Sequence, residues 1–204
     1  MPVTFKFDFD KAFAAIVYLA SKSDSVPEFD KLKAGKLLFF SDKYHLVRYA
    51  RPILGGSYRA IKFGPVPQDA LDYIHAVIDP ARASWVDAGK LKKLSDALVV
   101  DHGHQYPRLS AKEPINFSEY LSKSDLEALD HVIEKYGKKS ATELSALTHA
   151  MPAYLNAWET RGDQNKVDMK YEDFFEADPD AIEGALDEML EDDELRRAFP
   201  GTEF

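Results

Sequence analysis

Residues 30–67 read DKLKAGKLLFFSDKYHLVRYARPILGGSYRAIKFGPVP and contain the strongest structural signals in the chain. Asp30 suits the N-cap of a helix because its carboxylate can accept hydrogen bonds from the first unpaired backbone amides. In the residues that follow, one helical face carries small or apolar side chains: Ala34, Leu37, Leu38 and Ser41. Phe39 and Phe40 widen this apolar surface. We therefore predict a central, largely buried helix.

The same stretch then changes from a helical to an extended pattern. Pro52 and the pair Gly55-Gly56 end the helical region and open a turn. Residues 58–63 are predicted to form a short strand, which Gly64-Pro65 closes. Another helix is predicted for residues 67–78, because Pro67 is tolerated in the first turn of a helix.

Further helices are predicted on both sides of this stretch. Residues 10–20 place Phe13, Ile16 and Val17 on one helical face. Ser124 with Glu127, and Ser140 with Glu143, have the spacing of capping boxes that begin helices. These helices are expected to end at Gly137 and near residue 150, before Pro152.

Residues 79–114 are the least regular part of the chain. Two short runs in it, residues 97–100 and 105–109, have strand character and could pair with the strand at 58–63. The sequence thus predicts an α+β fold, a mainly α-helical single domain with a small antiparallel sheet.

The negative net charge of the chain arises from its C-terminal segment. The formal net charge is −9, and the segment 172–204 holds 13 acidic residues against two arginines. Ile182, Leu186 and Met189 lie on one face of an expected amphipathic helix, and acidic residues surround them. Because the rest of the chain is nearly neutral, nucleic acid is an unlikely ligand, and a basic surface on a protein partner fits better.

Several classes of protein are disfavoured by composition. The chain has no cysteine, which removes disulfides and thiol chemistry and fits a reducing, cytoplasmic location. No apolar run is long enough to span a membrane, and the N-terminus lacks the pattern of an export signal.

Candidate chemical groups are few. His102 and His104 are the nearest approach to a metal site, but no third ligand follows at helical spacing. Asp42 with His45, and Thr148 with His149, could be read as acid–base pairs, but structural hydrogen bonding is the better explanation. Common catalytic and nucleotide-binding motifs are missing, so we expect no enzyme activity, no metal and no cofactor.

Two stretches resemble a known family when they are read in order. The first joins Lys36-Leu-Leu-Phe-Phe40 to Lys62-Phe-Gly-Pro-Val-Pro67. The second holds the helix 126–137, the run from Ala141 to Thr148-His149, and the segment from Pro152 to Trp158. Together they resemble the Panacea domain of SocA-like antitoxins, which occur in bacterial and phage toxin–antitoxin pairs. The resemblance covers about residues 9–159 and implies a Panacea domain at 1–160, followed by an acidic extension at 161–204 packed on or beside it.

The resemblance implies a non-catalytic protein that neutralises a toxin, encoded by a neighbouring gene, through direct binding. Two alternatives remain open: an adaptor that delivers the bound partner to a protease, and a metal-dependent hydrolase built around the histidines. The oligomeric state is not indicated. The residues expected to contact the partner are Lys62, Phe63, Pro65, Val66, Glu183, Asp187, Glu188 and Glu191. The residues of the family motifs, expected to be structural, are Lys36, Leu37, Leu38, Gly64, Pro67, Thr148, His149 and Trp158.

Overall fold

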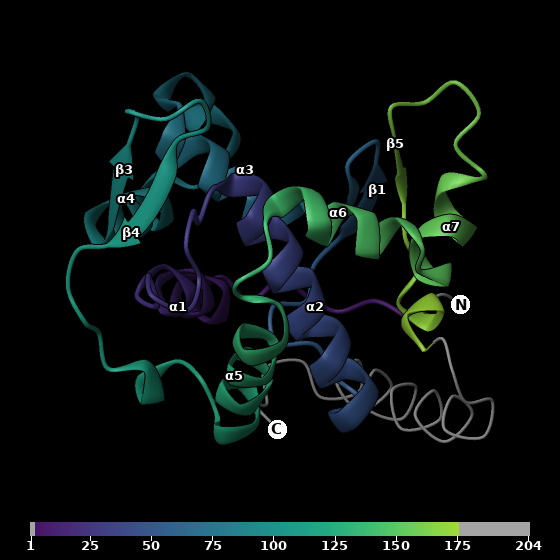
Figure 1. Cartoon of the computed structure of the whole chain (residues 1–204), viewed down its shortest axis with the longest axis horizontal. Helices are drawn as coiled ribbons and strands as arrows, with labels where there is room; N and C mark the ends of the chain where they lie inside the picture. The colour runs from purple at the N-terminus through teal and green to yellow at the C-terminus, as the bar shows by residue number, and fades with distance from the viewer. Residues whose placement is uncertain (1–2, 176–204) are drawn as a thin grey trace.

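The computed structural model describes residues 3–175 as a mainly helical α+β domain with two small antiparallel sheets (Figure 1). The helices are α1 (Phe9–Ala20), α2 (Lys31–Tyr49), α3 (Gln68–Ile78), α4 (Ala88–Ala97), α5 (Lys123–Tyr136), α6 (Ala141–His149) and α7 (Pro152–Trp158). The strands are β1 (Tyr58–Ile61), β2 (Gly64–Pro67), β3 (Leu98–Asp101), β4 (Arg108–Ala111) and β5 (Lys166–Asp168). Short 3₁₀ helices occupy Pro80–Trp85, Phe117–Glu119 and Tyr171–Phe174.

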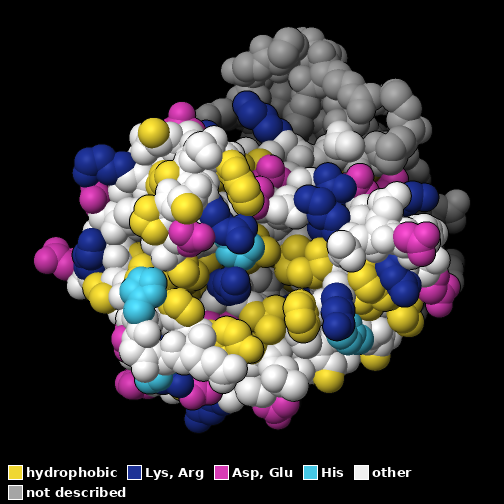
Figure 2. Space-filling model, turned by 90° about the horizontal axis from the view of Figure 1, so that it is seen from above, with side chains coloured by type: hydrophobic (Ala, Val, Ile, Leu, Met, Phe, Trp, Pro, Cys, Tyr) yellow, Lys and Arg dark blue, Asp and Glu magenta, His cyan; other side chains and the backbone are white. Residues whose placement is uncertain are grey.

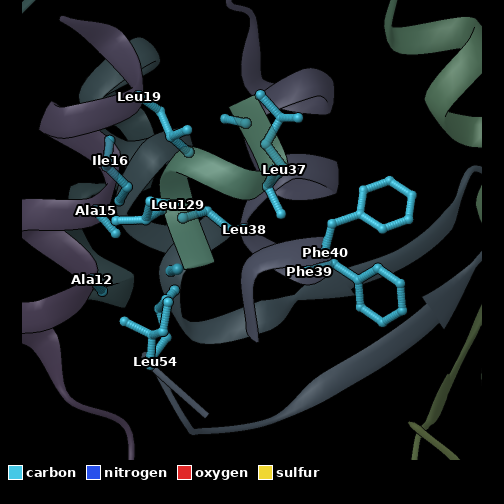
Figure 3. Close-up of a cluster of buried hydrophobic side chains, with 14 of the residues drawn as sticks. Ala12, Ala15, Ile16, Leu19, Leu37, Leu38, Phe39, Phe40, Leu54 and Leu129 are labelled. Atoms are coloured by element: carbon cyan, nitrogen blue, oxygen red, sulfur yellow. The ribbon is translucent and has the colours of Figure 1, made fainter. Parts of the chain in front are cut away.

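Helix α2 lies at the centre of the domain, as the sequence predicts (Figure 1). Its first turn is capped by Asp30, whose carboxylate accepts a hydrogen bond of 2.8 Å from the backbone amide of Lys33. Figure 3 shows Leu38 of α2 and Leu129 of α5 beside the face of α1 that carries Ala15, whereas Phe39 and Phe40 point away from α1. The central helix therefore contributes to the core on both of its sides.

The strands pair differently from the prediction for residues 97–109. β3 and β4 pair with each other, and neither joins β1. β1 instead lies between β2 and β5 in an antiparallel sheet of order β2-β1-β5. Residues 64–67, predicted as a turn and the start of a helix, form the strand β2, so β1 and β2 make a hairpin with Lys62 and Phe63 at its tip. β1 pairs with β2 because the two strands are adjacent in sequence, so their pairing closes only a short loop.

Two helix starts also differ from the prediction. The N-cap of α5 is Ser122, which forms a reciprocal capping box with Asp125, and not Ser124. Pro152 was expected only to break α6, but it is also the first residue of α7, a position that needs no backbone N–H. The box of Ser140 and Glu143 is confirmed. In the irregular region 79–114, α4 begins at a cap formed by Asp87 and was not predicted.

Residues 161–175 belong to the same folded unit as the helices. β5 pairs with β1, and the ring of Phe174 lies 5.3 Å from that of Phe39 and 5.2 Å from that of Tyr58. The expected acidic helix lies outside the described residues. Within residues 3–175, no helix is both long and apolar enough to cross a membrane.

Candidate functional site

Lys36 is a lysine of α2 whose side chain lies inside the protein. The residue is fully buried, and its Nζ donates a hydrogen bond of 2.9 Å to the backbone oxygen of Pro65. Because Pro65 has no N–H, we infer that β2 bonds to β1 through Val66 and Gly64, which leaves the Pro65 carbonyl directed away from β1. Lys36 therefore supplies a hydrogen-bond donor for the Pro65 carbonyl at the buried edge of the sheet. Without a donor, this buried carbonyl would destabilise the fold.

Gly64 brings the hairpin close to this lysine. Its φ of +96° is a backbone conformation that favours glycine, and hairpin connections commonly place such a residue just after the turn. A Cβ built on Gly64 would meet Lys36 Nζ and would lie 2.6 Å from Thr148 Oγ1. Lys36, Gly64 and Thr148 come from α2, β2 and α6, so the family-motif residues form one packed unit that fixes the hairpin to the two helices.

The ammonium group of Lys36 has no counter-ion among the described residues. Burial lowers its pKa to about 7. Removal of a charge from water disfavours the charged form, and the single carbonyl partner does not offset this cost.

Replacing Lys36 with methionine should remove a pH-dependent contribution to stability. The Lys36 amine titrates near 10.5 in the unfolded chain and near 7 in the folded one. Between these values the unfolded state binds more protons, so the parent should gain stability over Lys36→Met as the pH rises, by up to about 1.4 kcal/mol per pH unit. Urea unfolding of both chains between about pH 7 and pH 9 measures this difference. A difference that does not change with pH would contradict the lowered pKa.

A stack of rings connects this unit to the end of α7. His149 lies 4.9 Å from Tyr154, Tyr154 lies 5.7 Å from Trp158, and the guanidinium of Arg161 lies 4.3 Å from the Trp158 ring. The Tyr154 hydroxyl also donates a hydrogen bond of 3.0 Å to the backbone oxygen of Ile61. Tyr154 thus bonds α7 to β1, and Trp158 packs against Tyr154 in the same stack.

His149 is a base in a setting that disfavours its charge. Burial, and then the nearby charge of Lys36, lowers its pKa, while a hydrogen bond to the backbone of Lys62 acts in the opposite direction. Its Nε2 is buried and has no hydrogen-bond partner among the described residues. Neutral His149 therefore fits beside buried Lys36 better than the imidazolium form.

The tip of the β1–β2 hairpin is the exposed part of this assembly. Lys62 is exposed, and Phe63 is 56% exposed although it is a large apolar side chain. The Ser145 hydroxyl of α6 donates a hydrogen bond of 3.0 Å to the Phe63 backbone oxygen, which holds the tip in place. Pro65 and Val66, expected to contact a partner, are buried and present no side-chain surface. Of the four expected contact residues in the hairpin, Lys62 and Phe63 are therefore the two on the surface.

A groove of about 580 Å³ lies beside the hairpin tip, and we call it the hairpin groove. It is lined by Ile61, Lys62, Phe63, Trp158 and the segment 161–166. The hairpin and the segment between α7 and β5 project toward the top of Figure 1, which is the face seen in Figure 2. On that face, hydrophobic and basic side chains lie together near the middle, and most acidic side chains lie toward the edge.

Two lining residues of the groove, Arg161 and Lys166, were not identified from the sequence. The spacing of Tyr154, Trp158 and Arg161 was a usable signal, because residues four and three apart lie on one side of a helix. Lys166 could not be found in this way, since its position depends on the pairing of β5 with β1.

The acid–base candidates of the core have structural partners. Asp42 and His45 are both fully buried. Asp42 accepts hydrogen bonds from backbone amides and from Tyr58, whereas the His45 Nε2 lies 3.1 Å from a carboxylate oxygen of Asp125. Burial alone would raise the pKa of Asp125, but the hydrogen bond to His45 and the ammonium of Lys11 hold it well below the usual value. This network joins α1, α2 and α5 and gives no substrate access to these groups.

The histidines proposed as metal ligands lie at the surface. His102 and His104 are exposed, and His104 contacts the Asp101 carboxylate at 3.3 Å. In the described part of the chain, no three His, Asp or Glu side chains converge as a metal site would require. Thr148 is buried, and its hydroxyl donates to the backbone oxygen of Ser145 at 2.9 Å and not to His149.

The remaining predicted residues fall into two groups. Leu37 and Leu38 are completely buried, and Pro67 is buried at the end of β2. The acidic residues expected to meet a partner lie outside the described residues: Glu183, Asp187, Glu188 and Glu191.

Comparison with known protein families identifies the central part of the chain. A family model described as antitoxin SocA-like, Panacea domain, matches residues 35–154, which is more than half of the chain. No curated protein and no solved structure gives a significant match. The matched region runs from α2 to α7 and contains the unit of Lys36, Gly64 and Thr148 described above. The chain therefore belongs to the family of SocA-like antitoxins with a Panacea domain.

Proposed function

We propose that this chain is an antitoxin that neutralises a protein toxin, encoded by a neighbouring gene, through direct binding and without catalysis. The family supports the antitoxin role. The proposal places both the antitoxin and its toxin in the cytoplasm. The acidic residues beyond the described part would assist by attracting a basic surface of the toxin.

The observation that supports a binding role most strongly is the hairpin tip. Phe63 is exposed and lines the hairpin groove together with Trp158, so aromatic surface is available to a partner there. The backbone oxygen of Phe63 accepts the hydrogen bond from Ser145, and the next residue, Gly64, packs closely against Lys36 and Thr148. A rigid aromatic anchor loses little conformational entropy on binding, so it suits the centre of a protein interface.

Expression of the neighbouring gene alone should arrest growth, and co-expression of this chain should restore it. We expect the two proteins to co-purify as a complex, because neutralisation by binding requires a stable contact. Growth assays and pull-down from the same cultures measure both effects. Rescue without any detectable complex would contradict direct binding, and absence of rescue would contradict the antitoxin pairing.

A further inference from the structure

The hairpin groove carries three basic side chains, one of which, Lys166, also acts electrostatically on Asp72 of α3. Lys62, Arg161 and Lys166 line it, together with one acidic residue, Asp163. Among residues 3–175, none of the three basic side chains forms an ion pair. Basic groups gathered in a concave site raise the local concentration of anions. The groove is therefore suited to carboxylates, although the chain as a whole is acidic.

The same groove offers apolar contact at fixed positions. Phe63 and Trp158 both line it, and the Arg161 guanidinium lies over the Trp158 ring. Arg161 Nη1 also donates a hydrogen bond of 3.0 Å to the backbone oxygen of Trp158, which limits its movement. A ligand that combines carboxylates with an apolar side chain would match both features.

The backbone beside the groove favours an extended ligand. β5 is the outermost strand of its sheet and begins at Lys166, one of the lining residues. The backbone amide of Met169 donates a hydrogen bond to the Tyr58 oxygen of β1. Because alternate residues of a strand direct their backbone groups to opposite sides, the backbone of Val167 faces β1 and that of Lys166 faces away from it. An outer strand with outward-facing amides and carbonyls is a site to which an extended chain can add.

We propose that the hairpin groove receives an extended, acidic segment of the toxin. Its carboxylates lie among Lys62, Arg161 and Lys166, an apolar side chain of the segment contacts Phe63, and its backbone runs beside β5. This inference rests on the proposed antitoxin function, because it names the part of the toxin that the antitoxin holds.

Reversal of two groove charges should weaken the complex. In Lys62→Glu/Lys166→Glu, both substituted side chains are exposed, so folding should be unaffected. The Kd for the purified product of the neighbouring gene should rise at least about ten-fold at low salt, because like charges then face each other in the groove. The loss should shrink at high salt, where surface charges are screened.

A matched variant separates a local effect from an effect of net charge. Lys123, the first residue of α5, and Lys138, two residues after its end, are also exposed, and neither lines the groove. Lys123→Glu/Lys138→Glu changes the net charge equally and should bind with the parent Kd. If both double variants bind like the parent, the groove proposal is wrong while the antitoxin function stands. Equal weakening in both variants would also overturn it.

Hydrogen exchange and a model ligand test the groove without relying on neutralisation. The Lys166 amide should become protected when the toxin is added, and also with millimolar amounts of a capped peptide of alternating glutamate and valine. A lysine–valine peptide should give no protection. Equal protection by both peptides, or none, would overturn the proposal. The Lys166 amide could also be protected in the free full-length chain. If that protection is lost in a chain ended at Phe175, the acidic segment of the antitoxin itself occupies the groove, and the proposal is overturned.

Discussion

Asp42→Ala should lower the free energy of unfolding by about 3–5 kcal/mol and the Tm by about 10 °C. Asp42 is completely buried, and one carboxylate oxygen accepts hydrogen bonds from the amides of Ile53 and Leu54, each at 2.9 Å. The other oxygen accepts from the Tyr58 hydroxyl at 2.9 Å. Alanine would leave three buried donors without an acceptor, and each such loss costs about 1–3 kcal/mol. Urea and thermal unfolding at neutral pH measure the change.

Tyr58→Phe is the matched variant for this prediction. It removes one donor, keeps the ring in the core and should cost only about 1 kcal/mol. The pH dependence gives a second check, because burial raises the pKa of Asp42 to about 6. A raised folded-state pKa gives stability that is present below about pH 4 and is lost as the pH rises through 6, so the parent should exceed Asp42→Ala by more at pH 4 than at pH 7. A loss below about 1 kcal/mol at both pH values would show that these hydrogen bonds contribute little.

Elements with local signals could be predicted from the sequence. The cap at Asp30, the apolar face of α2 and the box of Ser140 and Glu143 each depend on residues within one or two helical turns. The choice between Ser122 and Ser124 as the cap of α5 could not be predicted in this way. The hydroxyl of Ser124 lies 3.0 Å from the His45 Nε2, and His45 is distant in sequence.

Elements whose partners lie far away in the sequence could not be predicted from local patterns. β5 has three residues, and its strand conformation depends on pairing with β1, which lies far earlier in the chain. For the same reason, the runs that form β3 and β4 were predicted to pair with β1, whereas they pair with each other. A short strand carries too few residues for its pattern to identify the neighbour.

The candidate site also divides into features with local signals and features that depend on distant partners. Lys36, Gly64 and Thr148 were identified as motif residues, but their meeting at one point depends on how α2, β2 and α6 pack. Pro65 and Val66 were expected to contact a partner as part of a rigid turn beside Lys62 and Phe63. In the fold they form a strand covered by α2 and α6.

Gly64→Ala should be the most damaging small substitution in the hairpin, with a loss of about 3 kcal/mol or more in the free energy of unfolding. A side chain at φ +96° costs roughly 1–3 kcal/mol by itself. The new methyl group must also displace Lys36 Nζ and Thr148 Oγ1, both of which are buried. Overpacking of a filled core typically adds about 1–3 kcal/mol. Urea unfolding compares the variant with the parent.

Gly162→Ala is a control that has a positive φ without the crowding. Gly162 also has a positive φ, +55°, but a Cβ there would meet no atom within 4 Å. Its substitution should therefore carry only the backbone cost, about 1 kcal/mol. If Gly64→Ala and Gly162→Ala cost the same, the close packing under the hairpin contributes nothing to the requirement for glycine.

A double-mutant cycle with Lys36→Met identifies which neighbour resists the new methyl group. Methionine has one heavy atom fewer than lysine along its side chain, so it leaves free the position that Lys36 Nζ occupies beside Gly64. Gly64→Ala should then cost less in the Lys36→Met chain than in the parent, with a coupling free energy of about 1 kcal/mol, as expected for residues in contact. The backbone cost and the contact with Thr148 persist in both chains, so rescue should be partial. Additive losses would mean that Lys36 moves aside freely and that Gly64 is required for its backbone conformation and the space beside Thr148 alone.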